Sequence, residues 1–99
     1  MAKSKIIWSH LAKIKLFEIL EYYAERNKSK TYSINLYKRV TNALDLLHKQ
    51  HDLGKKTELE GVRGIVVGDY ILFYEKTKDK VIVHTLWDCR QNPDNLKIK

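Results

Sequence analysis

Residues 59–74 read LEGVRGIVVGDYILFY, and this stretch decides the fold. Two runs rich in Val, Ile, Tyr and Phe, residues 62–67 and 69–75, meet at the dipeptide Gly68-Asp69. Such residues favour strands, and glycine supplies the positive φ that a tight hairpin turn requires. The stretch therefore predicts a β-hairpin.

Further strands are expected on either side of this hairpin. The run KVIVHTLW, residues 80–87, follows a polar turn at 77–80, so three successive strands predict an antiparallel meander. KIIW, residues 5–8, predicts an opening strand, and the glycine-containing polar segment 51–61 predicts a loop. Pro93 has no amide hydrogen to donate, so strand pairing is expected to end before it.

Two segments between the opening strand and the hairpin have helical periodicity. The first runs to about Arg26 with Ser9 as its N-cap, and the second runs from about Thr31 to Gln50. Their apolar stripes, each expected to be buried, are Leu16, Phe17, Leu20, Tyr23 and Ala24 in the first, and Leu36, Tyr37, Val40, Ala43, Leu44 and Leu47 in the second. The prediction is one α+β domain, residues 1–99, of order β-α-α-β-β-β, with an antiparallel sheet and an α-helical hairpin packed on one face.

The composition indicates a basic globular protein. Nineteen Lys and Arg against twelve Asp and Glu give a formal net charge of +7. This excess favours a polyanion or an acidic protein as partner, although solubility alone also accounts for it. No apolar run approaches the roughly 20 residues that a membrane helix needs, and no signal peptide is recognisable. With a single cysteine, a cytoplasmic location is expected, without membrane association.

The cationic residues of the C-terminal half are the main candidates for a site. Arg63 lies in the first meander strand, Arg90 follows the last, and Lys55 and Lys56 lie in the preceding loop. A basic cleft shared by these side chains would attract phosphate, which arginine binds through two parallel hydrogen bonds. Separate solvated cations on an open surface are an equally good interpretation.

Other polar residues carry weaker signals. His84 is more typical of a satisfied core histidine than of a general acid or base, and a buried, inert thiol is the favoured interpretation of Cys89. His48 and His51 have a spacing that is too weak to predict a metal site. We therefore expect neither a metal nor another cofactor. Glu58 reads by default as a solvated acid.

Two motifs carry a resemblance to a known family. The stretch LxGxRGxxVGDYxxxY (59–74) and the ending D-x-R-Q-N-P (88–93), together with the element order, resemble the RelE/ParE superfamily of type II toxins over nearly the whole chain. The resemblance implies a growth-inhibiting toxin, of the kind associated with plasmid stabilisation. It also implies a cognate acidic antitoxin that wraps the toxin.

The same resemblance leaves the mechanism open. RelE-like members cut mRNA on the ribosome, and this would assign phosphate binding to Arg63 and Arg90, RNA binding to Lys55 and Lys56, and base chemistry to Glu58, with His84 as a substitute acid or base. ParE-like members poison DNA gyrase and need only a binding surface. A third possibility is a non-catalytic partner-binding module. The cations slightly favour the ribosome-dependent endoribonuclease, although the chain has no Tyr or His after Arg90 to serve as the usual C-terminal acid or base.

Overall fold

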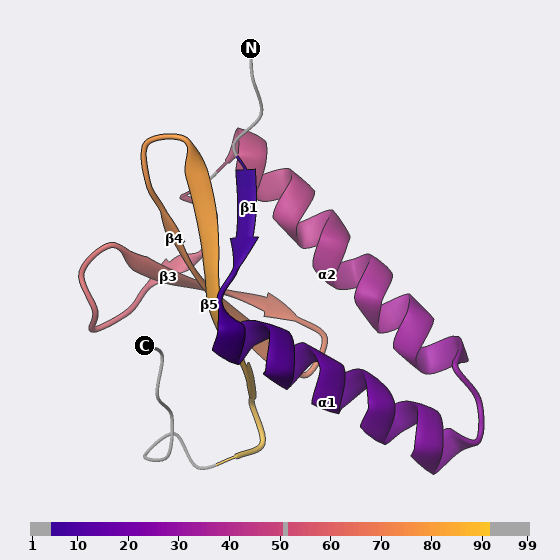
Figure 1. Cartoon of the computed structure of the whole chain (residues 1–99). Helices are drawn as coiled ribbons and strands as arrows, with labels where there is room; N and C mark the ends of the chain where they lie inside the picture. Colours follow the sequence, from indigo (N-terminus) through magenta and orange to yellow (C-terminus); the bar gives the residue numbers. More distant parts are fainter. Residues whose placement is uncertain (1–4, 51, 92–99) are drawn as a thin grey trace.

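The computed structural model describes residues 5–50 and 52–91, without the side chain of His48. Within them the chain forms two helices and five strands in an α+β fold (Figure 1). In chain order these are β1 (Lys5–Trp8), α1 (His10–Asn27), α2 (Thr31–Lys49), β2 (Lys55–Lys56), β3 (Val62–Val67), β4 (Tyr70–Lys76) and β5 (Lys80–Asp88). The predicted order is confirmed, with one addition: the two-residue strand β2 lies in the segment that was expected to be a loop. Pro93 lies outside the described residues.

The strands form one sheet in the order β1-β5-β4-β3-β2. Strands β2 to β5 pair antiparallel, as the meander predicted, but β1 pairs in parallel with β5, from Lys5 opposite Lys80 to Trp8 opposite Val83. The expectation of a purely antiparallel sheet was therefore wrong. A parallel pair needs a long connection, which the helical hairpin and the meander together provide.

The turn between β3 and β4 has the predicted geometry. Gly68 has φ 61°, and the strand pair closes on it with Val67 opposite Tyr70. A side chain on Gly68 would adopt this left-handed conformation at a cost and would also approach the guanidinium of Arg39 on α2. The positive φ of the hairpin turn therefore favours glycine at this position, and a larger residue would also displace the end of the Arg39 side chain.

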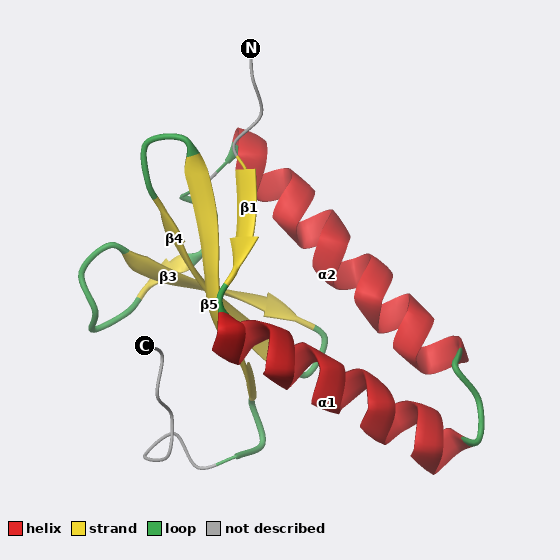
Figure 2. Cartoon of the chain, viewed as in Figure 1, coloured by secondary structure: helices red, strands yellow, loops and turns green. Residues whose placement is uncertain are grey.

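The helical hairpin and the sheet form two layers with the core between them (Figure 2). The core residues are Ala12 and Tyr23 from α1, Leu36, Val40, Leu44 and Leu47 from α2, and Val67, Tyr70, Leu72, Tyr74, Val81, Val83 and Leu86 from the sheet. The other members of the predicted stripes lie outside this core: Leu16, Leu20 and Ala43 pack against it, Ala24 is partly buried, and Phe17 and Tyr37 are 62% and 48% exposed. Neither described helix is long and apolar enough to cross a membrane.

Ser9 joins the start of α1 to the middle of β5. Its Oγ accepts a hydrogen bond from the amide of Ala12 at 3.0 Å, which confirms it as the N-cap, and donates one to the carbonyl of His84 at 2.8 Å. The pairing of β4 with β5 is irregular at this level, because Phe73 lies opposite Thr85 and Tyr74 opposite Val83, which leaves His84 as an extra residue. One hydroxyl therefore satisfies an orphan amide of the helix and a carbonyl of the bulged strand.

Ser9→Ala is expected to lower the free energy of unfolding by about 1–2 kcal/mol, because both hydrogen bonds are lost. Urea denaturation followed by circular dichroism measures the change. Thr41→Ala is the control, since the Thr41 hydroxyl donates to the carbonyl of Lys38 in its own helix. Equal stability of the Ser9 variant and the wild type would contradict the role assigned to this cap.

Candidate functional site at the end of the last strand

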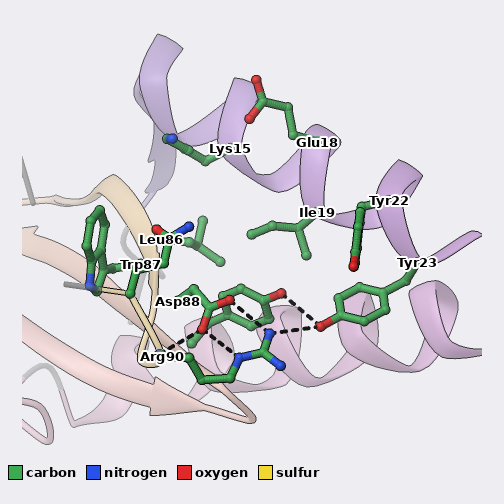
Figure 3. Close-up of a pocket in the computed structure, with 11 residues that line it drawn as sticks. Lys15, Glu18, Ile19, Tyr22, Tyr23, Leu86, Trp87, Asp88 and Arg90 are labelled. Carbon is green, nitrogen blue, oxygen red and sulfur yellow. Dashed lines mark hydrogen bonds and ion pairs between the residues drawn. The ribbon is translucent and has the colours of Figure 1, made fainter. Parts of the chain in front are cut away.

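A pocket of about 430 Å³ lies where α1 meets the end of β5 (Figure 3). Helix α1 contributes Lys15, Glu18, Ile19, Tyr22 and Tyr23, β4 contributes Tyr70, and the end of the chain's described part contributes Leu86, Trp87, Asp88, Arg90 and Gln91. Its size is within the range of small-ligand sites. It combines aromatic side chains with the cations Lys15 and Arg90.

Arg90 is held in one orientation by two elements that are far apart in sequence. Its Nε and Nη2 donate to the two carboxylate oxygens of Asp88 at 2.9 and 2.8 Å, which forms a bidentate ion pair. Nη2 also donates to the hydroxyl of Tyr23 on α1 at 3.2 Å. The guanidinium lies between these two groups in Figure 3. The side chain is nevertheless 59% exposed, so a partner can reach its free edge.

Tyr23 is the buried centre of this network. Its oxygen accepts a hydrogen bond from the hydroxyl of Tyr70 at 3.3 Å as well as the one from Arg90. Both hydrogen bonds favour the phenolate form and lower the pKa of Tyr23, and the one from Tyr70 has the larger effect. Burial raises the pKa of Tyr70. The ring of Tyr23 also packs on Tyr32, with ring centroids 4.4 Å apart. Tyr23 therefore couples the end of β5 to both helices.

The structure does not bring Arg63 and Arg90 together. Nη1 of Arg63 donates to the carbonyls of Gly54 at 2.8 Å and Asp52 at 3.2 Å, beside the start of β2. Arg63 lies opposite Tyr74, whereas Asp88 lies opposite Tyr70. Along the strands, the four residues from Tyr70 to Tyr74 separate Asp88 from Arg63 by about 13 Å. Across the sheet, the two strand spacings from β3 to β5 add about 10 Å. The shared basic cleft is thus not formed, because Arg63 instead holds the backbone that follows α2.

Of the other predicted site residues, Lys56 lies beside Arg63, whereas His84, Lys55 and Glu58 lie elsewhere. Nε2 of His84 lies 2.9 Å from Oε1 of Glu75, on the sheet face opposite the helices, where Lys55 also lies by its pairing with Gly64. Lys56 pairs with Arg63 on the helix side, and Glu58 is exposed in the turn before β3.

The remaining candidates are the thiol of Cys89 and the imidazoles of His48 and His51. Cys89 is exposed, so the expectation of a buried thiol was wrong: the chain has left the sheet at that point. His51 and the side chain of His48 lie outside the described part of the structure. Within residues 5–50 and 52–91, no three His, Cys, Asp or Glu side chains are grouped as a metal site would require.

The sequence did not indicate three residues that contact the predicted site residues Arg90 and His84 in the structure. Tyr23 was assigned to the core, and only the tertiary contact with Arg90 gives it a second role. Asp88 precedes Arg90 by two residues, and the turn after β5 brings the two side chains together as an ion pair. Glu75 lies nine residues from His84, and only their pairing across β4 and β5 brings them together.

The family model described as "ParE toxin of type II toxin-antitoxin system, parDE" matches residues 6–93. The chain belongs to the ParE toxin family. The match includes β1, both helices, the whole sheet and the Arg90 pocket, so the resemblance to the RelE/ParE superfamily is confirmed. No curated protein matches this ParE-family chain in sequence.

Solved structures show the same fold for this ParE-family toxin. A chain of the chromosomal ParDE toxin–antitoxin system from P. aeruginosa matches with TM-score 0.73 at 12% identity, covering 87% of this chain and 96% of the other. A chain of the E. coli DinJ-YafQ toxin–antitoxin complex matches with TM-score 0.52 at 16% identity, covering 88% and 93%. At these identities the likeness concerns the fold. Both structures come from toxin–antitoxin systems.

The Arg90 guanidinium holds the pKa of the Asp88 carboxyl below its ordinary value. A depressed folded-state pKa contributes stability above the ordinary carboxyl pKa, and this contribution is lost as pH falls through the folded-state value. We therefore expect Arg90→Ala to raise the pKa of Asp88, with Arg26→Ala as a control. Carboxyl-carbon NMR titration measures it, and an unchanged Asp88 pKa in the Arg90 variant would show that the ion pair does not form in solution.

Proposed function

We propose that this toxin acts by binding a protein target, DNA gyrase, and not by cutting RNA itself, with Arg90 and its pocket as a main contact. ParE-like members of the superfamily act on gyrase, and the chain belongs to the ParE family. The geometry that carries the proposal is the separation of Arg63 from Arg90.

RNA cleavage requires a base at the 2′-hydroxyl, cations at the phosphate and an acid at the leaving oxygen, all within reach of one bond. Arg63 is engaged by the backbone of residues 52 and 54, and Arg90 lies beyond the opposite end of β4. Glu58 is exposed in the turn before β3. These positions favour a mechanism that needs no such cluster.

The composition of the Arg90 pocket suits a protein partner. Arg, Trp and Tyr are the residues most enriched among interface hot spots, and the pocket combines Arg90 with Trp87 and Tyr22. Arg90 is already oriented by Asp88 and Tyr23, so it loses little conformational freedom on binding. An exposed, fixed guanidinium beside aromatic rings is a suitable anchor for an acidic group of the target.

We also propose that an acidic antitoxin neutralises the toxin. The net charge of +7 supports this proposal. Opposite net charges accelerate association and favour the correct partner. A toxin that is made alongside its antitoxin would thereby be captured before it reaches its target.

Arg90→Ala is expected to weaken gyrase binding by about 30-fold, the effect of losing about 2 kcal/mol at a hot spot. Purified gyrase and supercoiled plasmid provide the assay, with linear DNA released by detergent as the readout. Lys49→Ala is the control, because it removes one positive charge at the exposed end of α2. No cleavage complexes with the wild-type chain would contradict the proposed target, and full activity of the Arg90 variant would remove Arg90 from the interface.

Ribosome-dependent mRNA cleavage is the second candidate, and the His84–Glu75 pair favours it. The imidazole and carboxylate lie 2.9 Å apart on the sheet face opposite the two helices, with side chains 13% and 27% exposed, and Lys55 lies on the same face. A histidine and a carboxylate can supply an acid and a base, and Lys55 a cation. In this version Arg63, Arg90, Lys56 and Glu58 would act only as outlying contacts to RNA.

The second candidate predicts that inducing the chain without an antitoxin produces new 5′ ends at codon boundaries of translated messages. Primer extension detects these ends, and His84→Gln should abolish them because glutamine cannot transfer a proton. Intact messages in growth-arrested cells would exclude this candidate and leave the gyrase proposal standing.

A further inference from the structure

The contacts of Arg90 leave one nitrogen of its guanidinium available to a partner. The guanidinium presents its N–H groups in a rigid, planar fork. Nε uses its single hydrogen on Oδ1 of Asp88, and Nη2 uses its two hydrogens on Oδ2 of Asp88 and on the hydroxyl of Tyr23. Among the described residues, no group accepts a hydrogen bond from Nη1. The two N–H groups of Nη1 therefore remain for a target.

Asp88 and Tyr23 restrict the guanidinium in different ways. Asp88 belongs to the same turn as Arg90, and its Oδ1 also accepts a hydrogen bond from the backbone amide of Arg90 at 2.9 Å. Asp88 thus orients the side chain relative to its own turn. Tyr23 is 67 residues away on α1. Its hydrogen bond therefore orients the guanidinium relative to the helical wall of the pocket, where Lys15 and Glu18 lie (Figure 3).

Tyr23 is itself held firmly enough to set this orientation. It is only 8% exposed, and its ring contacts Tyr32 with centroids 4.4 Å apart and Tyr22 with centroids 5.1 Å apart. The hydroxyl of Tyr70, which is 4% exposed, donates to the oxygen of Tyr23 at 3.3 Å. The same oxygen then accepts the charge-assisted hydrogen bond from Arg90. A buried pair of tyrosines thus supports an exposed arginine.

We propose that Tyr23, supported by Tyr70, is a positioning residue of the toxin, whose hydroxyl holds the guanidinium of Arg90 so that Nη1 faces the target. This inference rests on the proposed function of Arg90 as a target contact. Tyr23 exposes too little surface to supply much contact area of its own, so it acts on the target through Arg90. A guanidinium that is already ordered loses less side-chain entropy on binding.

Tyr23→Phe removes the hydroxyl and keeps the ring in the core. We expect the NMR order parameter of the Nε–H bond of Arg90 to fall in this variant, because the guanidinium is then tied only to its own turn. Tyr22→Phe is the matched control, since Tyr22 lines the same pocket but its hydroxyl accepts a hydrogen bond from Arg26. An unchanged order parameter in Tyr23→Phe would reduce Tyr23 to a packing role and overturn the proposal.

A double-mutant cycle tests whether Tyr23 acts through Arg90. The readout is the toxin concentration that gives half-maximal gyrase–DNA cleavage. Tyr23→Phe is expected to raise this concentration roughly tenfold, the effect of losing a hydrogen bond to a charged group. In the Arg90→Ala background it is expected to have no further effect, because the group that it positions is absent. A further tenfold loss in the double variant, or wild-type potency of Tyr23→Phe alone, would overturn the proposal.

Growth arrest separates this inference from the identity of the target. The same cycle is measured in cells that produce the toxin without an antitoxin, at toxin levels matched by immunoblotting. If the wild-type chain forms no gyrase cleavage complexes but Tyr23→Phe weakens growth arrest only while Arg90 is present, the gyrase proposal fails and the positioning role stands. If cleavage complexes form and Tyr23→Phe is as potent as the wild type, the positioning role fails and the gyrase proposal stands.

Tyr70→Phe provides a second variant that leaves Tyr23 itself intact. It removes the supporting donor and is expected to lower potency about threefold, the effect of losing a neutral hydrogen bond, again only while Arg90 is present. Tyr37→Phe is the control, because it removes an exposed hydroxyl from α2, outside the Arg90 pocket. Equal potency of the Tyr70 and Tyr37 variants would contradict the supporting role of Tyr70.

Discussion

The pairing of β5 on both of its edges is the constraint on which the rest of the structure depends. β5 pairs with β1 in parallel and with β4 antiparallel, and its buried residues Val81, Val83 and Leu86 form part of the core. Because β1 runs directly into α1 through the Ser9 cap, the position of β1 on β5 fixes where the helical layer begins. The end of β5 is in turn where the polar network forms.

That network explains how an exposed arginine acquires a defined direction. Arg90 follows the last strand, where the backbone alone would leave its side chain free. Asp88 on its own segment and Tyr23 on α1 together restrict it. Surface ion pairs contribute little to stability, so the main effect of this arrangement is to orient the guanidinium of Arg90 and not to hold the fold together.

Three surfaces of the described structure differ in physical character. The Arg90 pocket combines cations with aromatic rings, an apolar groove between α1 and α2 is lined by Phe17, Ile34 and Tyr37, and the sheet face opposite the helices carries the His84–Glu75 pair. They lie on separate parts of the described structure. Separate surfaces of this kind allow a small toxin to contact more than one partner without requiring the partners to share one site.

The sequence by itself determined the elements, because each depends on local patterns: the strand–glycine–strand stretch around Gly68, the helical periodicity, and the Ser9 cap. It also determined the family, through motifs that run along the chain. Only the tertiary structure decided the parallel pairing of β1, the separation of Arg63 from Arg90, and the contact of Tyr23 with Arg90, 67 residues apart. The physical reason is that the direction of a long side chain depends on strand register and on partners from distant segments. Similarly, Phe17 and Tyr37 fit the helical stripe, but their burial depends on how much of each helix the sheet covers.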